Sequence, residues 1–315
     1  MLMSRRFWKV MLGAKSSHAA VCRLEGFIGT DFDVDEDLTG RLPDTLREFN
    51  KQWVPFFLDL NPVKGKVSAG LCAGQLWTVS RGLALGDIIL SSTGKPGELW
   101  AGEVTGDYYF EPAGPLPHRR PVKWFPGVIH REELTASLRA SLGFGATVCE
   151  LSHHAEEIES AINLDSDGDE PTSDPAVFAL EAILEEFLVT NWAKTSLGDD
   201  YEIVSDNGEL IGRQYPTDTG PMDILAISKD GKTLLVVELK RDKASDKVVG
   251  QIQRYMGYVI DEVATPDQNV RGVIIALEDD IRIRRALRVA QNIDFYRYEV
   301  TFRLNRTDLS SQPGQ

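Results

Sequence analysis

Two carboxylates and a lysine stand at a spacing that can bind a metal ion. Asp223 lies in an apolar run (MDILAIS), and Glu238-Leu239-Lys240 ends the next one (TLLVVEL). Asp230-Gly231 between the runs indicates a β-hairpin; if these two residues form its loop, Asp223 and Glu238 lie opposite each other. Such carboxylates suit Mg²⁺, and the lysine could steer water or phosphate. A surface salt bridge is the alternative, because Glu-x-Lys alone is common.

The pattern of apolar residues after position 175 predicts an α/β domain. A first helix begins at Asp174-Pro175, where aspartate can cap and proline suits the first helical position. The further elements that we expect are strands at 201–205, 209–215, 222–228, 233–239, 272–277 and 295–304, and helices at 245–263 and 280–291. This order is typical of a mixed sheet sandwiched between helices.

The N-terminal half has short strand-like segments separated by glycine and proline. We expect strands at 7–11, 76–79, 87–91, 99–104 and 122–124, and a helix around 131–142. Such spacing predicts a small β-barrel with accessory helices. An acidic stretch with proline, glycine and serine then predicts a linker. We therefore divide the chain into residues 1–162, a linker at 163–174, and residues 175–315.

Composition and charge limit the classes of function. The 315 residues have ordinary globular content, and no window approaches the apolar length of a membrane span. Three scattered cysteines argue for a reducing compartment, and with the absence of a signal peptide pattern we expect a cytoplasmic protein. The net charge of −14 argues against broad nucleic-acid affinity but permits a local basic groove, because much of the acid is concentrated in two stretches.

Several motifs of the C-terminal half occur together and in a recognisable order. They are Glu181, 212–215 (GRQY), 220–225 (GPMDIL), 237–241 (VELKR) and 250–255 (GQIQRY). With these motifs, residues 175–304 resemble the PD-(D/E)XK nuclease superfamily, most closely its NucS/EndoMS-type and Mrr-like branches. The resemblance implies a restriction-endonuclease-like mixed sheet and hydrolysis of phosphodiester bonds.

The resemblance also implies roles for the residues of the hairpin. Asp223 and Glu238 would bind Mg²⁺ or Mn²⁺ together with the backbone carbonyl of Leu239. Lys240 would orient or help to deprotonate the attacking water and stabilise the developing charge on phosphorus.

Residues outside the hairpin would complete the catalytic site. Glu181 would act through a water or a second metal, unless it is a solvated helix acid. Gln251 and Tyr255 share a helix face and could reach Lys240 or the phosphate, with core packing as the alternative for Tyr255. Arg213, a candidate for contacting DNA, is followed by Gln214 where the family usually has glutamate, which removes a possible acid.

Basic residues follow the hairpin motif. Arg241 and Lys243 could contact DNA phosphates, as could Lys247. A second basic run on the later helix, Arg282, Arg284, Arg285 and Arg288, is typical of a solvated face.

A looser resemblance links the N-terminal half to EVE/PUA-like barrels. It rests on the segments 86–90 (GDIIL), 100–109 (WAGEVTGDYY) and 118–124 (HRRPVKW). Some members of that group admit a flipped, modified base into an aromatic pocket. The candidates for the pocket walls are Trp77, Trp100, Tyr108, Tyr109 and Trp124, and the candidates for holding phosphate or a base edge are His118, Arg119 and Arg120. Barrel core is the alternative for each aromatic residue.

The sequence thus suggests a metal-dependent DNA endonuclease that recognises modified bases in restriction or antiphage defence. The alternatives are a repair nuclease for mismatched or branched DNA and a catalytically silent nucleic-acid-binding module, and RNA also stays open as a substrate. We expect DNA as the partner and no membrane. The sequence does not settle the base modification, the cut pattern, a homodimer or an activating partner.

Overall fold

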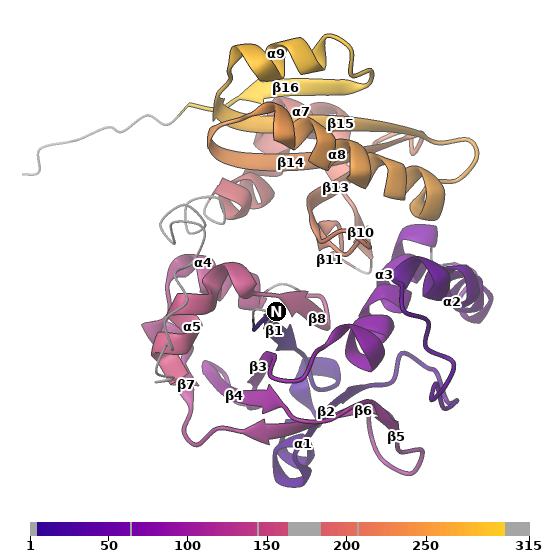
Figure 1. The fold of residues 1–315 in the computed structure, drawn as a ribbon, viewed down its shortest axis with the longest axis vertical. Coiled ribbons are helices and arrows are strands. Elements are labelled where there is room, and N and C mark those ends of the chain that lie inside the picture. Colours follow the sequence, from indigo (N-terminus) through magenta and orange to yellow (C-terminus); the bar gives the residue numbers. More distant parts are fainter. Residues whose placement is uncertain (1–4, 64, 144, 163–183, 207, 300–315) are drawn as a thin grey trace, which may run out of the picture.

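The computed structural model describes residues 5–63, 65–143, 145–162, 184–206 and 208–299. Two sheets follow each other along the long axis of the molecule, one from each half of the chain (Figure 1). The expected linker at 163–174, together with Glu181, lies outside the described residues, so the division into three parts stays a prediction. No described helix is both long enough and apolar enough to cross a membrane.

The C-terminal sheet has six strands in the order β12-β13-β14-β15-β16, with β9 also paired to β13. The strands are β9 (Tyr201–Ile203), β12 (Arg213–Tyr215), β13 (Met222–Ser228), β14 (Thr233–Lys243), β15 (Asn269–Glu278) and β16 (Ile293–Arg297). β12, β13 and β14 pair antiparallel, whereas β14, β15 and β16 run parallel. This mixed sheet with flanking helices confirms the fold class predicted from the sequence.

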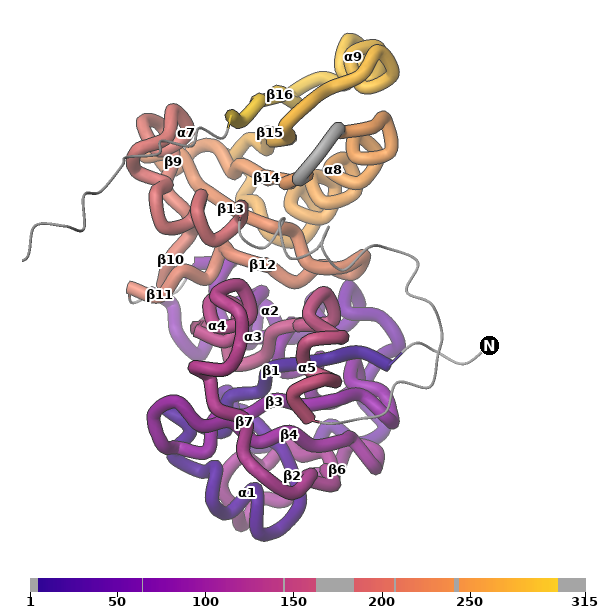
Figure 2. The backbone as a smooth tube through the Cα atoms, turned by 90° about the vertical axis from the view of Figure 1, so that its left-hand side faces the viewer, coloured from indigo at the N-terminus to yellow at the C-terminus, as the bar shows by residue number. Residues whose placement is uncertain are grey.

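Helices cover both faces of this sheet (Figure 2). One face packs against α8 (Asp246–Tyr258), its π-helical continuation η6 (Val259–Val263), and α9 (Ile281–Leu287). The other face packs against helical residues 184–191, η5 (Trp192–Lys194) and α7 (Ser196–Asp200). Side chains of β14 alternate between these faces: Val236 joins the α8 core, and Val237 joins the opposite one. Both faces are apolar, as expected for a sheet covered on each side.

The N-terminal sheet has eight strands. They are β1 (Phe7–Val10), β2 (Phe27–Thr30), β3 (Ile88–Ser92), β4 (Glu98–Val104), β5 (Tyr109–Phe110), β6 (His118–Trp124), β7 (Ile129–His130) and β8 (Val148–Glu150). The accompanying helices include α1 (Ala19–Glu25), α4 (Ala136–Gly143) and α5 (Ala155–Ile162). The main strand order is β2-β6-β4-β3-β1-β8, with β5 on β6 and β7 on β4. The PUA/EVE-like assignment of this half stays a prediction.

Two helices between the sheets differ from what the sequence suggested. The strand expected at 76–79 is wrong, because these residues end α3 (Lys66–Trp77) and begin the π-helical turn η2 (Thr78–Gly82). Ala69, Ala73 and Leu76 recur at helical spacing and pack against α2 (Leu46–Leu60), which the sequence reading missed.

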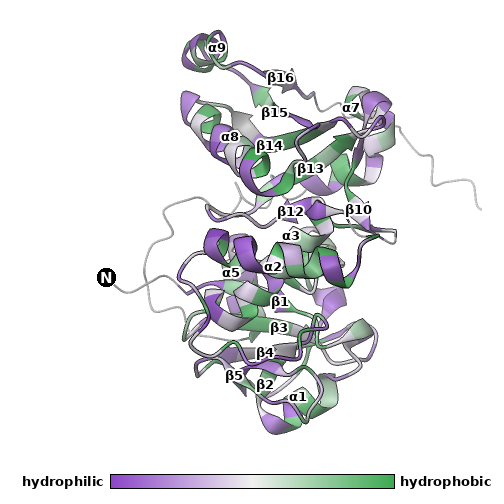
Figure 3. Ribbon diagram, turned by 90° about the vertical axis from the view of Figure 1, so that its right-hand side faces the viewer, coloured by the Kyte–Doolittle hydropathy of each residue, from purple (hydrophilic) through white to green (hydrophobic). Residues whose placement is uncertain are grey.

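The α2–α3 pair joins the two halves through packed contacts (Figure 3). Tyr215 of β12 is fully buried, and its hydroxyl donates to the carbonyl of Val67 at 3.0 Å. Leu71 of α3 belongs to the same core cluster as β13 and α8. Asn50 of α2 donates to the hydroxyl of Tyr258 at 3.0 Å in a buried contact. The strand β12, next to the candidate site, is therefore held from both halves of the chain.

A close approach at Gly70 gives a test of this interface. A Cβ atom at Gly70 would lie 2.7 Å from the Tyr215 hydroxyl oxygen. We expect Gly70→Ala to lower the free energy of unfolding by about 1–3 kcal/mol, and by less in a Tyr215→Phe background, which lacks that oxygen. Urea denaturation of the four proteins measures both effects.

The matched control is Gly257→Ala in α8, where a Cβ atom meets nothing within 4 Å. This substitution should leave stability unchanged or raise it by up to about 1 kcal/mol. Equal costs of Gly70→Ala in the wild type and in the Tyr215→Phe variant would contradict the assigned contact.

Candidate active site

The hairpin register is the one that the sequence predicted. Ile224 pairs with Val237, and the ladder continues in register to Ile227 and Leu234. The loop comprises residues 229–232 rather than Asp230-Gly231 alone, with a turn closed by the hydrogen bond from Gly231 N to Ser228 O at 2.8 Å. Because the centre of the loop is unchanged, Asp223 and Glu238 are the next facing positions beyond the ladder.

Beyond the last backbone pair of the hairpin, a side chain supplies the next hydrogen bond between the strands. The Asp223 carboxylate accepts a hydrogen bond from the backbone N–H of Leu239 at 2.7 Å. Glu238 is 1% exposed and accepts from the ammonium group of Lys240 at 2.8 Å. Strand alternation directs Glu238 and Lys240 to the face covered by α8, and Leu239 into the opposite core. Two acids and one cation therefore meet at this end of the β13–β14 ladder.

The donor set suits a hard divalent cation. Within a β-strand the N–H and C=O groups of one residue face the same neighbour, so we expect the Leu239 carbonyl to face the Asp223 end of β13. Mg²⁺ is typically held by one or two carboxylates and keeps several waters, so Asp223, Glu238 and this carbonyl fit it. The part of the chain that the structure describes contains no group of three or more His, Cys, Asp or Glu residues suited to a metal.

Gln251 and Tyr255 lie beside these acids. The amide of Gln251 donates to the Tyr255 hydroxyl at 3.4 Å. Burial, together with the nearby carboxylates of Glu238 and Asp223, raises the pKa of Tyr255. Tyr255 is 5% exposed and packs in the α8 core. It is therefore both a core residue, which was the alternative, and a neighbour of the site. The predicted grouping of Gln251 and Tyr255 near the carboxylates agrees with this geometry, whereas their catalytic roles stay predictions.

Glu185 is an acid near Asp223 that the sequence reading did not select. It belongs to the helical residues 184–191 and follows Glu181 by four positions in the sequence, a spacing that would have been the signal. Its carboxylate forms a buried ion pair with Arg213 and accepts from the amide of Gln214. The same amide donates to Asp223 at 3.3 Å. Gln214 thus links Glu185 to Asp223.

Arg213 therefore has an internal role. The residue is 6% exposed. Its guanidinium contacts the carboxylate of Glu185 and, at 2.7 Å, that of Glu186. Burial raises the pKa of Glu185 to about 7, with a further contribution from Asp223, although Arg213 opposes the shift. DNA binding by Arg213, which we expected, stays a prediction, and these two ion pairs occupy the side chain in this structure.

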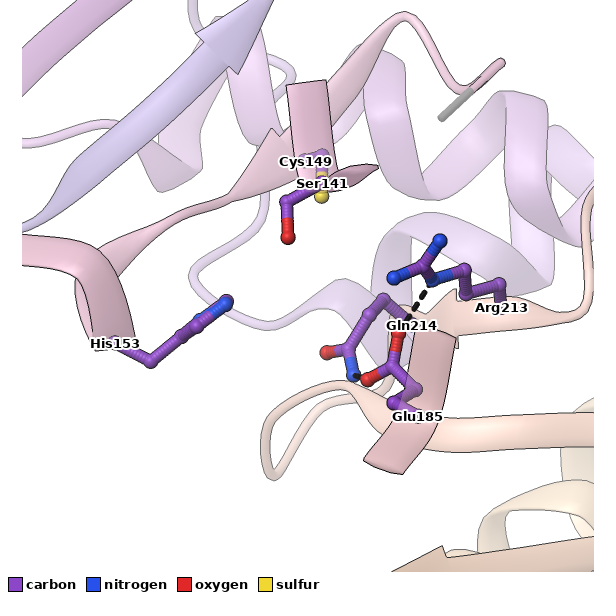
Figure 4. A pocket seen from close by; sticks show the side chains of 6 residues that line it. All are labelled: Ser141, Cys149, His153, Glu185, Arg213 and Gln214. Atoms are coloured by element: carbon purple, nitrogen blue, oxygen red, sulfur yellow. Dashed lines mark hydrogen bonds and ion pairs between the residues drawn. The ribbon is translucent and has the colours of Figure 1, made fainter. Parts of the chain in front are cut away.

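A small cavity lies between the halves at this network (Figure 4). Ser141, Cys149 and His153 of the N-terminal half line it together with Glu185, Arg213 and Gln214. Its volume of about 10 Å³ accommodates roughly one water molecule. Burial lowers the pKa of His153 to about 3, so a neutral ring faces the network at neutral pH. A larger open cavity of about 690 Å³ contains none of the predicted site residues.

The basic candidates of the N-terminal half are buried. His118 contacts the Tyr108 hydroxyl at 2.9 Å and the Val34 carbonyl at 2.8 Å. Arg119 donates to the carbonyls of Leu116 and Pro115, and Arg120 donates to those of Gly106 and Leu83. These contacts hold loops in place, and contact of the three residues with nucleic acid stays a prediction.

The aromatic candidates are partly buried. Trp100 and Trp124 meet edge to face with ring centroids 6.4 Å apart, and the guanidinium of Arg23 lies over both rings. Tyr109 is half-buried in β5, and Trp77 donates to the Pro43 carbonyl. The strands β4, β5 and β6, which contain Trp100, Tyr109 and Trp124, lie at the end of the molecule away from β13 and β14 (Figure 1). The structure therefore does not bring these residues to the carboxylates.

Arg241 and Lys243 are part of β14, and their side chains lie outside the described set.

The raised pKa of Glu185 predicts a pH-dependent stability. The folded state binds this proton more tightly than the unfolded state, whose carboxyl has a pKa near 4.5. The contribution of Glu185 to the free energy of unfolding should therefore be greatest below about pH 4.5 and fall by roughly 1.4 kcal/mol per pH unit as the pH rises toward 7. We expect this decline in the wild type relative to Glu185→Gln, measured in EDTA by urea denaturation from pH 5 to pH 8. Parallel curves for the two proteins would contradict it.

Comparisons with known proteins match each half of the chain to a sequence family. Residues 196–307 match the family model of the endonuclease NucS C-terminal domain, and residues 8–152 match a domain of unknown function (DUF8426). Endonuclease NucS of Corynebacterium glutamicum is 38% identical over 126 residues, which cover 39% of this chain and 46% of that protein. Endonuclease NucS of Pyrococcus abyssi is 34% identical over 74 residues, which cover 24% and 28% of the two chains. The chain thus spans about half the length of the Corynebacterium relative, and less of the other.

Solved structures give weaker likenesses. A repair endonuclease from Pyrococcus abyssi has a TM-score of 0.31 at 18% identity, covering 65% of this chain and 63% of that one. A structure of an EndoMS–dsDNA2 complex has a TM-score of 0.30 at 15% identity, covering 65% and 62%. The family match and the sequence relatives carry the assignment, together with the motifs in β13 and β14. In the C-terminal half, residues 196–307 are therefore similar to the C-terminal domain of NucS/EndoMS-type endonucleases.

Proposed function

We propose that the protein is a metal-dependent DNA endonuclease that acts in repair. The observation that carries this proposal is the alignment of Asp223, Glu238 and Lys240 at one edge of the sheet, within a domain that matches the NucS C-terminal family. A catalytically silent binding module is less well supported, because both acids and the lysine are present and oriented together.

In this proposal Asp223, Glu238 and the Leu239 carbonyl hold Mg²⁺ or Mn²⁺. The ion would act as a Lewis acid toward a phosphate oxygen and would lower the pKa of a bound water molecule. The Leu239 N–H fixes the orientation of the Asp223 carboxylate. Lys240, whose side chain is 30% exposed, is placed to donate to a phosphate oxygen or to orient water. Gln251 and Tyr255 shape the neighbouring wall of the site.

Repair fits the relatives better than restriction or antiphage defence, the function that the sequence first suggested. The relatives named above are called endonuclease NucS, and one solved neighbour is described as a repair endonuclease. Recognition of modified bases by Trp100, Trp124 and Tyr108 loses support, because β4, β5 and β6 are remote from β13 and β14. One active site cuts one strand at a time, so double-strand cleavage would need a second copy or a second binding event.

Substitution of Asp223 tests the site. We expect Asp223→Asn to reduce Mg²⁺- or Mn²⁺-dependent nicking of a plasmid by at least about 10²-fold, because a charged metal ligand is lost. Calorimetric titration with Mn²⁺ should show weakened binding, while the thermal unfolding midpoint stays near that of the wild type. The matched control is Asp230→Asn, an exposed acid in the loop of the same hairpin. Undiminished nicking by Asp223→Asn would refute the assignment.

Substrate comparison tests the biological role. Duplexes that contain a mismatch, a branch, methylated or hydroxymethylated cytosine, or no lesion should be incubated side by side with a matched RNA. We expect faster cleavage of the mismatched or branched duplex. Cleavage confined to modified DNA would instead favour restriction, and preferred cleavage of RNA would overturn the DNA assignment.

A further inference from the structure

Five exposed cations on α8 and α9 have no acidic partner among the residues that the structure describes. They form a set that we call the α8–α9 strip: Lys247, Arg254, Arg282, Arg285 and Arg288. Other exposed arginines are paired with acids, namely Arg41, Arg47, Arg81 and Arg297. Arg284, which is on α9 itself, is also paired. In a chain of net charge −14, this group of unpaired cations calls for an external partner.

The spacing of the residues gives the strip a continuous surface. Lys247 and Arg254 are seven residues apart, which places them on one side of α8 about 10 Å apart along its axis. Gly250 lies between them and adds no side chain. Arg282 and Arg285 are one turn apart on α9, and Arg288 follows at its C-cap.

The two helices lie side by side. Val248 of α8 and Ile283 of α9 belong to one core cluster. Both helices cover the same face of the sheet (Figure 2). The exposed cations of α8 and α9 therefore belong to two adjacent helices that cover the same face of the sheet.

The strip begins at the candidate active site. Lys247 is one turn before Gln251, whose amide contacts Tyr255 beside the carboxylates. Both helices start beyond the carboxyl ends of β14 and β15, and Glu238 lies five residues before the end of β14. Two exposed acids, Asp246 and Glu278, lie at these carboxyl ends. Two further acids are engaged in internal contacts, because Asp279 pairs with Arg284 and Asp280 caps α9.

We propose that the α8–α9 strip binds the phosphate backbone of double-stranded DNA flanking the scissile phosphate; this inference rests on the proposed function. Exposed lysine and arginine side chains bind phosphates without regard to base sequence. Gly250 lets a backbone approach the helix closely. The helices α8 and α9 expose no aromatic ring, because the tyrosines of α8 are buried and α9 has no aromatic residue. Binding sites for single strands, in contrast, combine cations with aromatic rings on which the bases stack. The duplex, with its bases stacked inside, is the matching partner.

The test is the salt dependence of DNA binding by the full-length protein in an Asp223→Asn background without divalent ions. Fluorescence anisotropy would follow a labelled duplex of about 30 base pairs between about 50 and 200 mM salt. We expect Lys247→Ala/Arg254→Ala to reduce the slope of log K against log salt by about 0.9 per lost phosphate contact. Arg282→Ala/Arg285→Ala should reduce it similarly. The matched control is Arg284→Ala, which removes an ion-paired arginine of the same helix.

The outcomes separate this proposal from the proposed function. Unchanged slopes in both double variants would overturn the strip, and so would an equal reduction by Arg284→Ala. A reduced slope for a single strand but not for the duplex would overturn the choice of partner. Nicking by the wild type, measured separately, decides the proposed function. If the wild type nicks DNA but the variants keep the same salt slope, the protein binds DNA through another surface.

Discussion

The hydrogen bond from the backbone N–H of Leu239 to the Asp223 carboxylate is the contact on which the candidate site depends. It forms where the β13–β14 ladder ends, so a side chain takes over from the backbone there, while β14 continues to pair with β15. A register shift of one residue would turn Glu238 and Lys240 into the opposite core and bring an apolar side chain to the edge. The buried apolar residues of both strands make such a shift costly, and the stability of the sheet thereby protects the geometry of the acids.

A second constraint comes from the charges buried beside this edge. Glu185 is held between Arg213 and Gln214, and Gln214 reaches Asp223, so the site is connected to the cavity between the two halves. Burying a carboxylate is costly unless it is paired, and Arg213 offsets part of that cost. The strand β12 carries these residues and is also held by the contact of Tyr215 with α3. The N-terminal half therefore supports the strand that lies next to the site.

The N-terminal half illustrates how residue type can mislead about function. His118, Arg119 and Arg120 look like a basic patch in the sequence, yet all three are buried and donate to or contact loop carbonyls. Arginine has five donors in a planar fork, so it can hold several loop carbonyls as readily as it can hold a phosphate. The arginines of the α8–α9 strip have the opposite setting, because they are exposed and lack acidic partners among the described residues.

The sequence by itself determined the mixed sheet and the facing positions of Asp223 and Glu238. Those features follow from local patterns, namely alternation within strands and a turn centred on Asp230-Gly231. Only the tertiary structure decided the place of Glu185 and the helical state of residues 76–77, because both depend on partners distant in the chain. Arg213 beside Glu185 and α2 beside α3 supply those partners. Periodicity reports which side of an element is apolar, whereas the identity of the neighbour on that side arises only when the chain folds.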